Sequence, residues 1–282
     1  MIVPELKDDD FLADVARARA DATNLHLWWL GQSGFLVQWQ NHHLLLDPYL
    51  SDSLTEKYAG SDKPHVRMTE RVVAPEKLNF IDVVTSSHNH TDHLDGDTLA
   101  PLLRANPKVQ LVIPEANRAF VAGRLKLAVE KPHGLDAGQS AAFGAFKITG
   151  IPAAHNVIET DESGRHKYLG YIIEAGPWTI YHSGDTKHFE GMEVLLRQWT
   201  IDVALLPING DLPGRRVAGN LSGIEAAKLG KDIGARMVIP CHFEMFEFNT
   251  VSPKEFVTSC EQIGQRHRVL RCGEGWSTNE LE

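Results

Sequence analysis

The sequence predicts an α/β (α+β) fold in which two mixed β-sheets pack together and helices cover their outer faces. After a short helical arm, the chain continues as a series of short, β-rich runs separated by turn residues, which is a meander pattern. Strands and helices then alternate along the rest of the chain. A sandwich of two sheets with helices outside accommodates both orders, because each sheet and each helix must bury its apolar side.

Composition excludes several classes of protein. The 282 residues include 28 basic and 37 acidic side chains, a net charge of −9, and 43% are hydrophobic, as in ordinary globular proteins. No run approaches the roughly 20 apolar residues that cross a bilayer, and the acidic start lacks the apolar part of a secretory signal. We therefore expect a cytoplasmic location, no membrane partner and, given the charge, no nucleic-acid partner.

One domain, residues 1–282, is expected because no repeat or low-complexity linker divides the chain. Residues 1–24 are predicted to form an N-terminal helical arm, since three aspartates at 8–10 precede an Ala/Arg-rich segment and acids favour a helix start. The three widely spaced cysteines are expected to be reduced and buried: Cys241, Cys260 and Cys272. The number of subunits stays open, with a homo-oligomer among the options.

The first predicted strands form the meander. They cover residues 25–31, 34–40 and 42–48. Trp28 and Trp29 alternate on the first of them, so one should lie in the core and the other under a helix or a partner subunit. His42 and His43 are interpreted as turn residues, and the polar residues 51–75 as a long loop.

The remaining elements follow from apolar runs and helix signals. Helices are predicted over 98–104, 114–123 and 191–199, from Ser222 with its capping-box partner Glu225, and from about residue 252. Strands are predicted over 81–87, 109–114, 127–133, 202–208, 235–242 and 267–273, with two runs in 139–155 and a hairpin in 168–185.

The segment 88–93, with the pattern H-x-H-x-D-H, carries the chemistry. Its histidines and carboxylate are His88, His90, Asp92 and His93. Composition predicts a chance match in roughly two sequences of this kind in a thousand, so the motif is specific. Imidazole and carboxylate are natural ligands of Zn, Mn and Fe(II). A turn at the end of a strand can direct these side chains toward two neighbouring cations.

Three further candidate ligands each follow an apolar β-run: His155, Asp185 and His242. Open sheets expose functional residues at such strand ends. Taken singly, each is more often a structural loop residue. Together with the motif, they complete a ligand set for divalent cations.

The sequence resembles the metallo-β-lactamase superfamily and, within it, the L-ascorbate-6-phosphate lactonase family. The likeness covers most of residues 25–265 and is carried by WWLGQSGFLV (28–37), SHNHTDHLD (87–95), the segment 179–214 and ARMVIPCHFEMF (235–246). The resemblance implies a four-layer αβ/βα sandwich and a hydrolase with two divalent cations per chain, Mn or Zn, with Fe as a further option. It implies one cation at His88, His90 and His155, a second at Asp92, His93 and His242, and Asp185 between them.

The implied reaction is hydrolysis of a small ester or lactone, phosphorylated or otherwise anionic, by a metal-bound hydroxide. Asp92 is the predicted catalytic residue, which orients the hydroxide and passes its proton to the leaving alkoxide. Asp47 is expected to hold the tautomer of a ligand histidine, or else to be a turn carboxylate. His182 is expected to support its loop or to donate to substrate.

Two arginines are candidates for substrate recognition. Arg215 and Arg216 are candidate anion-binding residues, because a guanidinium matches phosphate and carboxylate, although adjacent arginines are often a solvated pair. The aromatic and Met residues after His242 suit either an apolar wall of the site or the core: Phe243, Met245, Phe246 and Phe248.

Two other functions remain open. The same di-metal core cleaves P–O bonds, and SHNHTDHLD also resembles the N-acylphosphatidylethanolamine phospholipase D branch, while an RNA-processing branch shares the core motif. A phosphodiesterase is therefore the alternative activity. A metal-binding scaffold or sensor without turnover is the third option, against which the complete ligand set argues.

Overall fold

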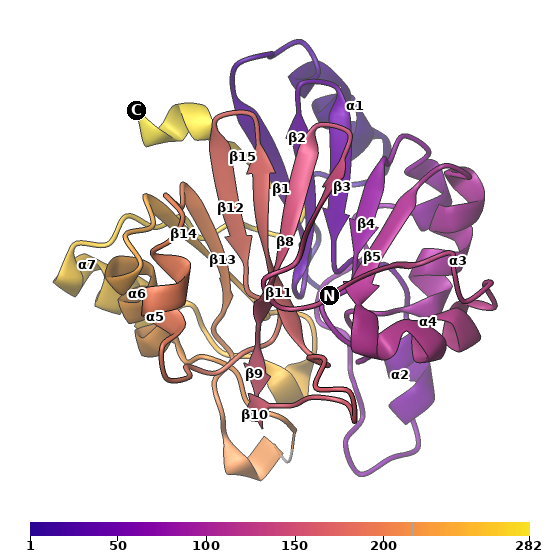
Figure 1. Ribbon diagram of the computed structural model, residues 1–282. Coiled ribbons are helices and arrows are strands. Elements are labelled where there is room, and N and C mark those ends of the chain that lie inside the picture. Colours follow the sequence, from indigo (N-terminus) through magenta and orange to yellow (C-terminus); the bar gives the residue numbers. More distant parts are fainter. Residues whose placement is uncertain (216) are drawn as a thin grey trace.

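Two mixed β-sheets pack against each other and helices cover both outer sides (Figure 1). The structure, a computed structural model, describes every residue except Arg216. The buried side chains of both sheets belong to one continuous apolar core, for example Leu45 from one sheet and Ile172 from the other. This architecture confirms the predicted fold class.

The first sheet is built from the N-terminal half and one strand from the C-terminus. In the described residues its order is β15-β1-β2-β3-β4-β5-β6. The strands are β1 (Leu25–Gly31), β2 (Gly34–Trp39), β3 (His42–Leu46), β4 (Val83–Thr85), β5 (Gln110–Pro114), β6 (His133–Leu135) and β15 (Gly275–Ser277). The pairs among β15, β1, β2 and β3 are antiparallel, whereas β3 to β6 are parallel.

The second sheet has the order β14-β13-β12-β11-β8-β7 among the described residues. Its strands are β7 (Ser140–Phe143), β8 (Phe146–Pro152), β11 (Leu169–Ala175), β12 (Trp178–His182), β13 (Val203–Pro207) and β14 (Met237–Cys241), and a separate pair is β9 (Ala154–His155) with β10 (Val157–Ile158). Strands β12, β13 and β14 run parallel, so their carboxyl ends meet at one edge.

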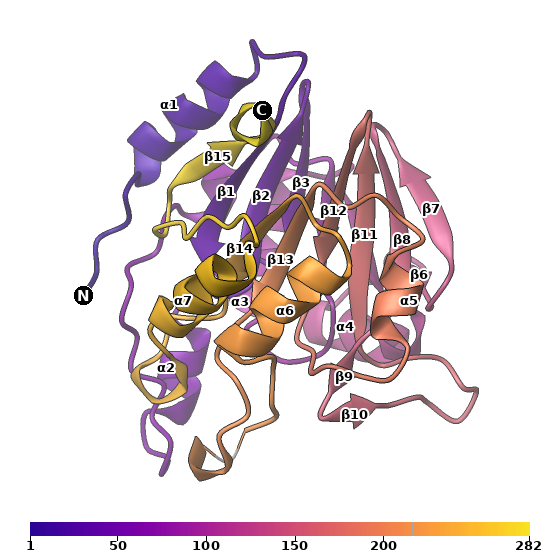
Figure 2. The same ribbon diagram turned by 90° about the vertical axis from the view of Figure 1, so that its left-hand side faces the viewer.

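Helices complete the outer layers (Figure 2). They are α1 (Asp8–Ala18), α3 (Gly96–Ala105) and α4 (Arg118–Leu125) beside the first sheet, and α5 (Met192–Leu196), α6 (Gly223–Asp232) and α7 (Lys254–Ile263) beside the second. Helix α6 begins with the predicted capping box of Ser222 and Glu225. A short helix, α2 (Ser53–Tyr58), lies at the same end of the sandwich as β9 and β10 (Figures 1 and 2).

The N-terminal arm packs on the first sheet. Phe11 and Val15 of α1 are fully buried, and the indole N–H of Trp28 donates to Asp14 at 2.8 Å. The helix-covered member of the tryptophan pair is therefore Trp28, while Trp29 stacks on Phe243 in the core with ring centroids 4.5 Å apart. The three cysteines are free and buried, and no described helix is long and apolar enough to cross a membrane.

Some local predictions are wrong. Of the strand predicted at 127–133, only His133 lies in a strand, because Arg118 donates to the carbonyls of Val129 and Pro132 and Pro132 has no N–H for a ladder. The segment 267–273, predicted as a strand, forms only an isolated β-bridge between His267 and Val238 among the described residues. The strand of this region is β15, which begins two residues later.

Two further local predictions differ from the structure. The expected loop 51–75 contains α2. His42 and His43 belong to β3, not to a turn, and His43 is buried.

Candidate metal centre

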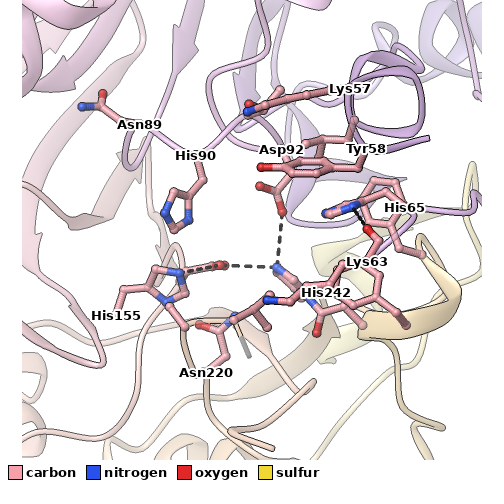
Figure 3. A pocket seen from close by; sticks show the side chains of 18 of the residues that line it. Lys57, Tyr58, Lys63, His65, Asn89, His90, Asp92, His155, Asn220 and His242 are labelled. Carbon is pink, nitrogen blue, oxygen red and sulfur yellow. Dashed lines mark hydrogen bonds and ion pairs between the residues drawn. The ribbon is translucent and has the colours of Figure 1, made fainter. Parts of the chain in front are cut away.

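The candidate ligands meet at the carboxyl ends of strands from both sheets. The motif 88–93 follows β4 and turns sharply, because the N–H groups of His93 and Leu94 both donate to the carbonyl of His90, at 3.1 and 2.8 Å. His155 ends β9, Asp185 follows β12 and His242 follows β14. Figure 3 shows His90, Asp92, His155 and His242 directed toward one space.

Three imidazoles form the first group: His88, His90 and His155. One ring nitrogen of each lies within 4.8 Å of the others. Nδ1 of His155 is 3.0 Å from the carbonyl of Gly219, and Nδ1 of His88 is 3.0 Å from Oγ of Ser87. Because the Nδ1 atoms have these partners, the Nε2 atoms of these two rings are left for a ligand.

The second group combines a carboxylate with two imidazoles: Asp92, His93 and His242. Oδ2 of Asp92 lies 3.6 Å from Nε2 of His93 and 3.6 Å from Nε2 of His242. The backbone of His242 has a φ of 63°, in the left-handed region that few non-glycine residues adopt. Such strained backbone persists where the surrounding structure enforces it, commonly at functional sites.

Asp185 lies between the two groups. Its Oδ1 is 3.2 Å from Nε2 of His93, and its Oδ2 is 3.4 Å from Nε2 of His242 and 3.6 Å from Nε2 of His155. Gly184 permits this approach, since a Cβ there would lie 2.7 Å from the side chain of Ser87 and 2.9 Å from the carbonyl of Leu169. The carboxylate thus contacts ligands of both groups.

The arrangement fits divalent cations. Among the described residues, Nε2 of His88 is buried without a hydrogen-bond partner, and Nε2 of His93 and Oδ1 of Asp185, 3.2 Å apart, make no other contact of hydrogen-bond geometry. Buried polar atoms normally have partners, so orphaned atoms converging on one point indicate an ion. Imidazole nitrogens and carboxylate oxygens without cysteine suit Zn, Mn or Fe(II). These His and Asp groups are positioned to bind metal.

The electrostatics divide the histidines into two kinds. Burial lowers the pKa values of three of them, which keeps them neutral: His88, His90 and His155. Burial also acts against the charged forms of His93 and His242, but the carboxylates of Asp185 and Asp92 outweigh it. They raise the pKa of His93 well above its usual range and that of His242 to about 9. A cation that binds the second group therefore replaces protons.

Asp47 and Ser87 contact the candidate ligand histidines on the ring nitrogens that face away from the centre. The carboxylate of Asp47 is fully buried and lies 2.7 Å from Nδ1 of His93. It also accepts hydrogen bonds from the backbone N–H, at 2.9 Å, and the hydroxyl of Ser87. The contact expected of Asp47 with a ligand histidine is present, and it leaves Nε2 of His93 facing the centre.

Replacing Asp47 with alanine is expected to lower the free energy of unfolding by about 3 kcal/mol, because it leaves His93 buried without its partner. The same change should weaken cation binding roughly 10- to 100-fold, as loss of groups that orient ligands does. Urea unfolding with chelator present measures the first effect, and cation titration the second. Asp97→Ala, an exposed aspartate of α3, is the control. Equal stability and affinity in both variants would contradict this role.

A cavity of about 420 Å³ opens over the ligands, a size typical of sites for small molecules. Residues from α2, the loop after it and the segment after β14 form its wall: Leu54, Lys57, Tyr58, Lys63, His65, Phe246, Phe248 and Asn249. Tyr58 and His65 stack with centroids 4.3 Å apart, and Phe248 meets His65 at 4.4 Å. The site therefore has an aromatic wall and two lysines at its edge.

Arg215 does not lie among the residues that line this cavity. Its guanidinium donates to the carbonyls of Asn209 and Thr250, so the described contacts join two loops, and its role toward substrate stays a prediction. Arg216 lies outside the described residues.

His182 is fully buried, with Nε2 3.0 Å from the carbonyl of Ser33. This contact supports the turn after β1. Of the four residues after His242 with two expected placements, Phe243 lies in the core, Met245 packs with Tyr49 and Leu54, and Phe246 and Phe248 line the cavity.

Several site residues were not predicted from the sequence. Ser87 could have been found, because it directly precedes the motif. The wall from α2 and the next loop gave no signal, since 51–75 was interpreted as a polar loop. Arg124 was also missed; it donates to the carbonyls of Asn89 and Leu94 and so holds the motif loop.

Comparisons agree on the family. A model of the beta-lactamase superfamily domain matches residues 42–243. A UPF0173 metal-dependent hydrolase of Pelotomaculum thermopropionicum is 32% identical over 251 residues, which cover 87% of this chain and 96% of that protein. With its αβ/βα sandwich and its centre of histidines and aspartates, the protein is of the metallo-β-lactamase-fold class. The chain belongs to the family defined by the beta-lactamase superfamily domain. It is a metal-dependent hydrolase.

Solved structures show the same fold. Igni18, a novel metallo hydrolase from Ignicoccus hospitalis, has a TM-score of 0.66 at 24% identity, covering 90% of this chain and 98% of its own. An isothiocyanate hydrolase from Delia radicum gut bacteria has a TM-score of 0.69 at 18% identity, covering 89% and 98%.

Proposed function

We propose that this hydrolase cleaves a small ester or lactone that carries an anionic group, such as a phosphorylated lactone, with two divalent cations per chain. The observation that carries the proposal is the position of the two ligand groups at the cavity, with Asp185 between them and Lys57 and Lys63 at the edge. The resemblance to the L-ascorbate-6-phosphate lactonase family supports the same substrate class.

Bound divalent cations would activate water as a nucleophile and polarise the substrate carbonyl. The chain itself supplies the proton-transfer group. Both Asp92 and Asp185 line the cavity, but the side chain of Asp92 is 17% exposed and that of Asp185 only 4%. Asp92 is therefore the carboxylate placed to orient water and to pass a proton to the leaving oxygen.

The cavity wall suits a compact, partly planar substrate. Tyr58, His65 and Phe248 offer ring surfaces, and the ammonium groups of Lys57 and Lys63 can pair with a phosphate or carboxylate. Both lysine side chains are positively charged, although the chain as a whole has a net charge of −9. The side chains that line the cavity favour an anionic small molecule as the substrate. We expect the protein to encounter this substrate in the cytoplasm.

A phosphodiesterase remains the second candidate, because lysines beside a cation centre suit a phosphodiester as well. Protein loaded with Zn or Mn is to be tested on phosphorylated lactones and on phosphodiesters. Carboxylate release from the lactones supports the proposal. Cleavage of phosphodiesters alone would replace it with the second candidate, and failure on both panels would favour a binding protein.

Lys57→Met is expected to raise KM for an anionic lactone roughly 5-fold, the effect of losing an exposed charge pair worth about 1 kcal/mol. The value of kcat and the KM for a neutral lactone should not change. Steady-state kinetics at low ionic strength measures this effect, with Lys108→Met, an exposed lysine outside the cavity lining, as control. An unchanged KM for the anionic lactone would exclude Lys57 from recognition.

A further inference from the structure

Gln32 is a fully buried polar residue whose backbone is fixed beside the ligands. It lies in the turn between β1 and β2, with no exposed surface and a φ of 50°. Its carbonyl accepts hydrogen bonds from the backbone N–H of His242 and from the indole N–H of Trp29, both at 2.9 Å. The turn is therefore tied directly to the residue that supplies a predicted ligand.

The side chain of Gln32 reaches into the second ligand group. Its terminal Nε2 is 2.7 Å from Oδ2 of Asp92 and 3.0 Å from Nε2 of His242. Its Oε1 is buried and has no hydrogen-bond partner among the described residues. Burying an amide oxygen without a hydrogen-bond partner costs free energy of folding, so the position of this atom requires an explanation.

These distances match a coordination shell. Around a cation with octahedral bonds of about 2.1 Å, neighbouring ligand atoms lie about 3 Å apart. The amide head of Gln32 stands at this separation from two of the three ligand atoms. The amide oxygen and nitrogen have nearly the same shape, so a half-turn of the head about its last torsion exchanges them without moving it.

We propose that Gln32 supplies its side-chain oxygen as an additional ligand to the cation held by Asp92, His93 and His242. Without a cation, the amide nitrogen faces the carboxylate; with one, the amide oxygen faces the cation. The inference rests on the proposed cation binding and makes the second subsite richer in oxygen than the all-histidine group. Oxygen ligands favour Mn over softer ions, so the two subsites differ in preference.

The test titrates the chelator-treated protein with Mn²⁺ in a calorimeter, so the readout does not depend on activity. Gln32→Met keeps the length of the side chain and removes the oxygen. It should weaken Mn²⁺ binding to the group of Asp92, His93 and His242 roughly 10- to 100-fold. Gln32→Glu restores an oxygen and should bind at least as tightly as the parent. Gln38→Met, which changes a buried glutamine of β2 that contacts His43, is the matched control.

Each result supports the inference or overturns it. Equal affinities in the parent and a folded Gln32→Met variant would overturn it and leave the proposed function standing. A Gln32→Glu protein that binds Mn²⁺ as weakly as the Gln32→Met protein would also overturn the inference. The amide of Gln32 would then act only as a hydrogen-bond donor to Asp92. If Gln32→Met does not fold, the Glu variant alone decides. A parent that binds no Mn²⁺ or Zn²⁺ would overturn both proposals.

Discussion

Asp92→Ala is expected to lower kcat/KM roughly 1,000-fold, within the range attributed to a positioned acid or base. Asp92 is the more exposed of the two carboxylates at the centre, and its Oδ2 lies within 3.6 Å of both His93 and His242. Its removal takes away a proposed ligand and the proposed proton-transfer group together. Turnover of a phosphorylated lactone by cation-loaded protein measures the effect.

Two controls separate these roles. Asp97→Ala, on the exposed side of α3, should retain parental kinetics. Elemental analysis of the Asp92→Ala protein shows whether its cations remain; inactivity with both cations present assigns the loss to proton transfer. Near-parental turnover by Asp92→Ala would remove Asp92 from the mechanism.

The double change His88→Ala, His90→Ala should remove at least the cation assigned to the all-histidine group. We expect about two equivalents in the parent, as in two-metal hydrolytic sites. Of the three imidazoles in that group only His155 then remains, and one imidazole does not hold a divalent cation at a structural site. Elemental analysis after dialysis measures the content.

The matched control replaces two histidines away from the centre, His42 and His188, which are 45% exposed. It should keep the parental cation content. One equivalent in the parent would argue against a two-cation reaction. None, even after reconstitution with Zn or Mn, would contradict the whole assignment of the centre.

The candidate ligands could be found in the sequence because their signals are local, and the structure brings them together. The motif after β4 is contiguous, and the other candidates lie at strand ends: His155 ends β9, and Asp185 and His242 come within three residues of the ends of β12 and β14. The carboxyl ends of neighbouring parallel strands must meet at one sheet edge. Recognition of individual strands was therefore enough to bring Asp185 and His242 together, although the errors at 127–133 and 267–273 show that strand boundaries and short strands were less secure.

The cavity was not predictable in the same way. Gln32 meets His242 across 210 residues of sequence, and Asp47 meets His93 across 46. Helix α2 forms one wall although its segment is too polar to show a strand or helix pattern. Arg215 had the right chemistry for an anion, yet its hydrogen bonds go to backbone carbonyls of two loops.

The fold class, the family and the residue types of the candidate metal centre could all be inferred from the sequence. These depend on hydrophobic periodicity and on a short motif, both of which are properties of neighbouring residues. Three features came from the folded structure: the ring nitrogen of each histidine that faces the centre, the side chains that line the cavity, and the position of the Gln32 amide beside Asp92 and His242. Such contacts join residues far apart in the chain, and packing of the two sheets sets their distances.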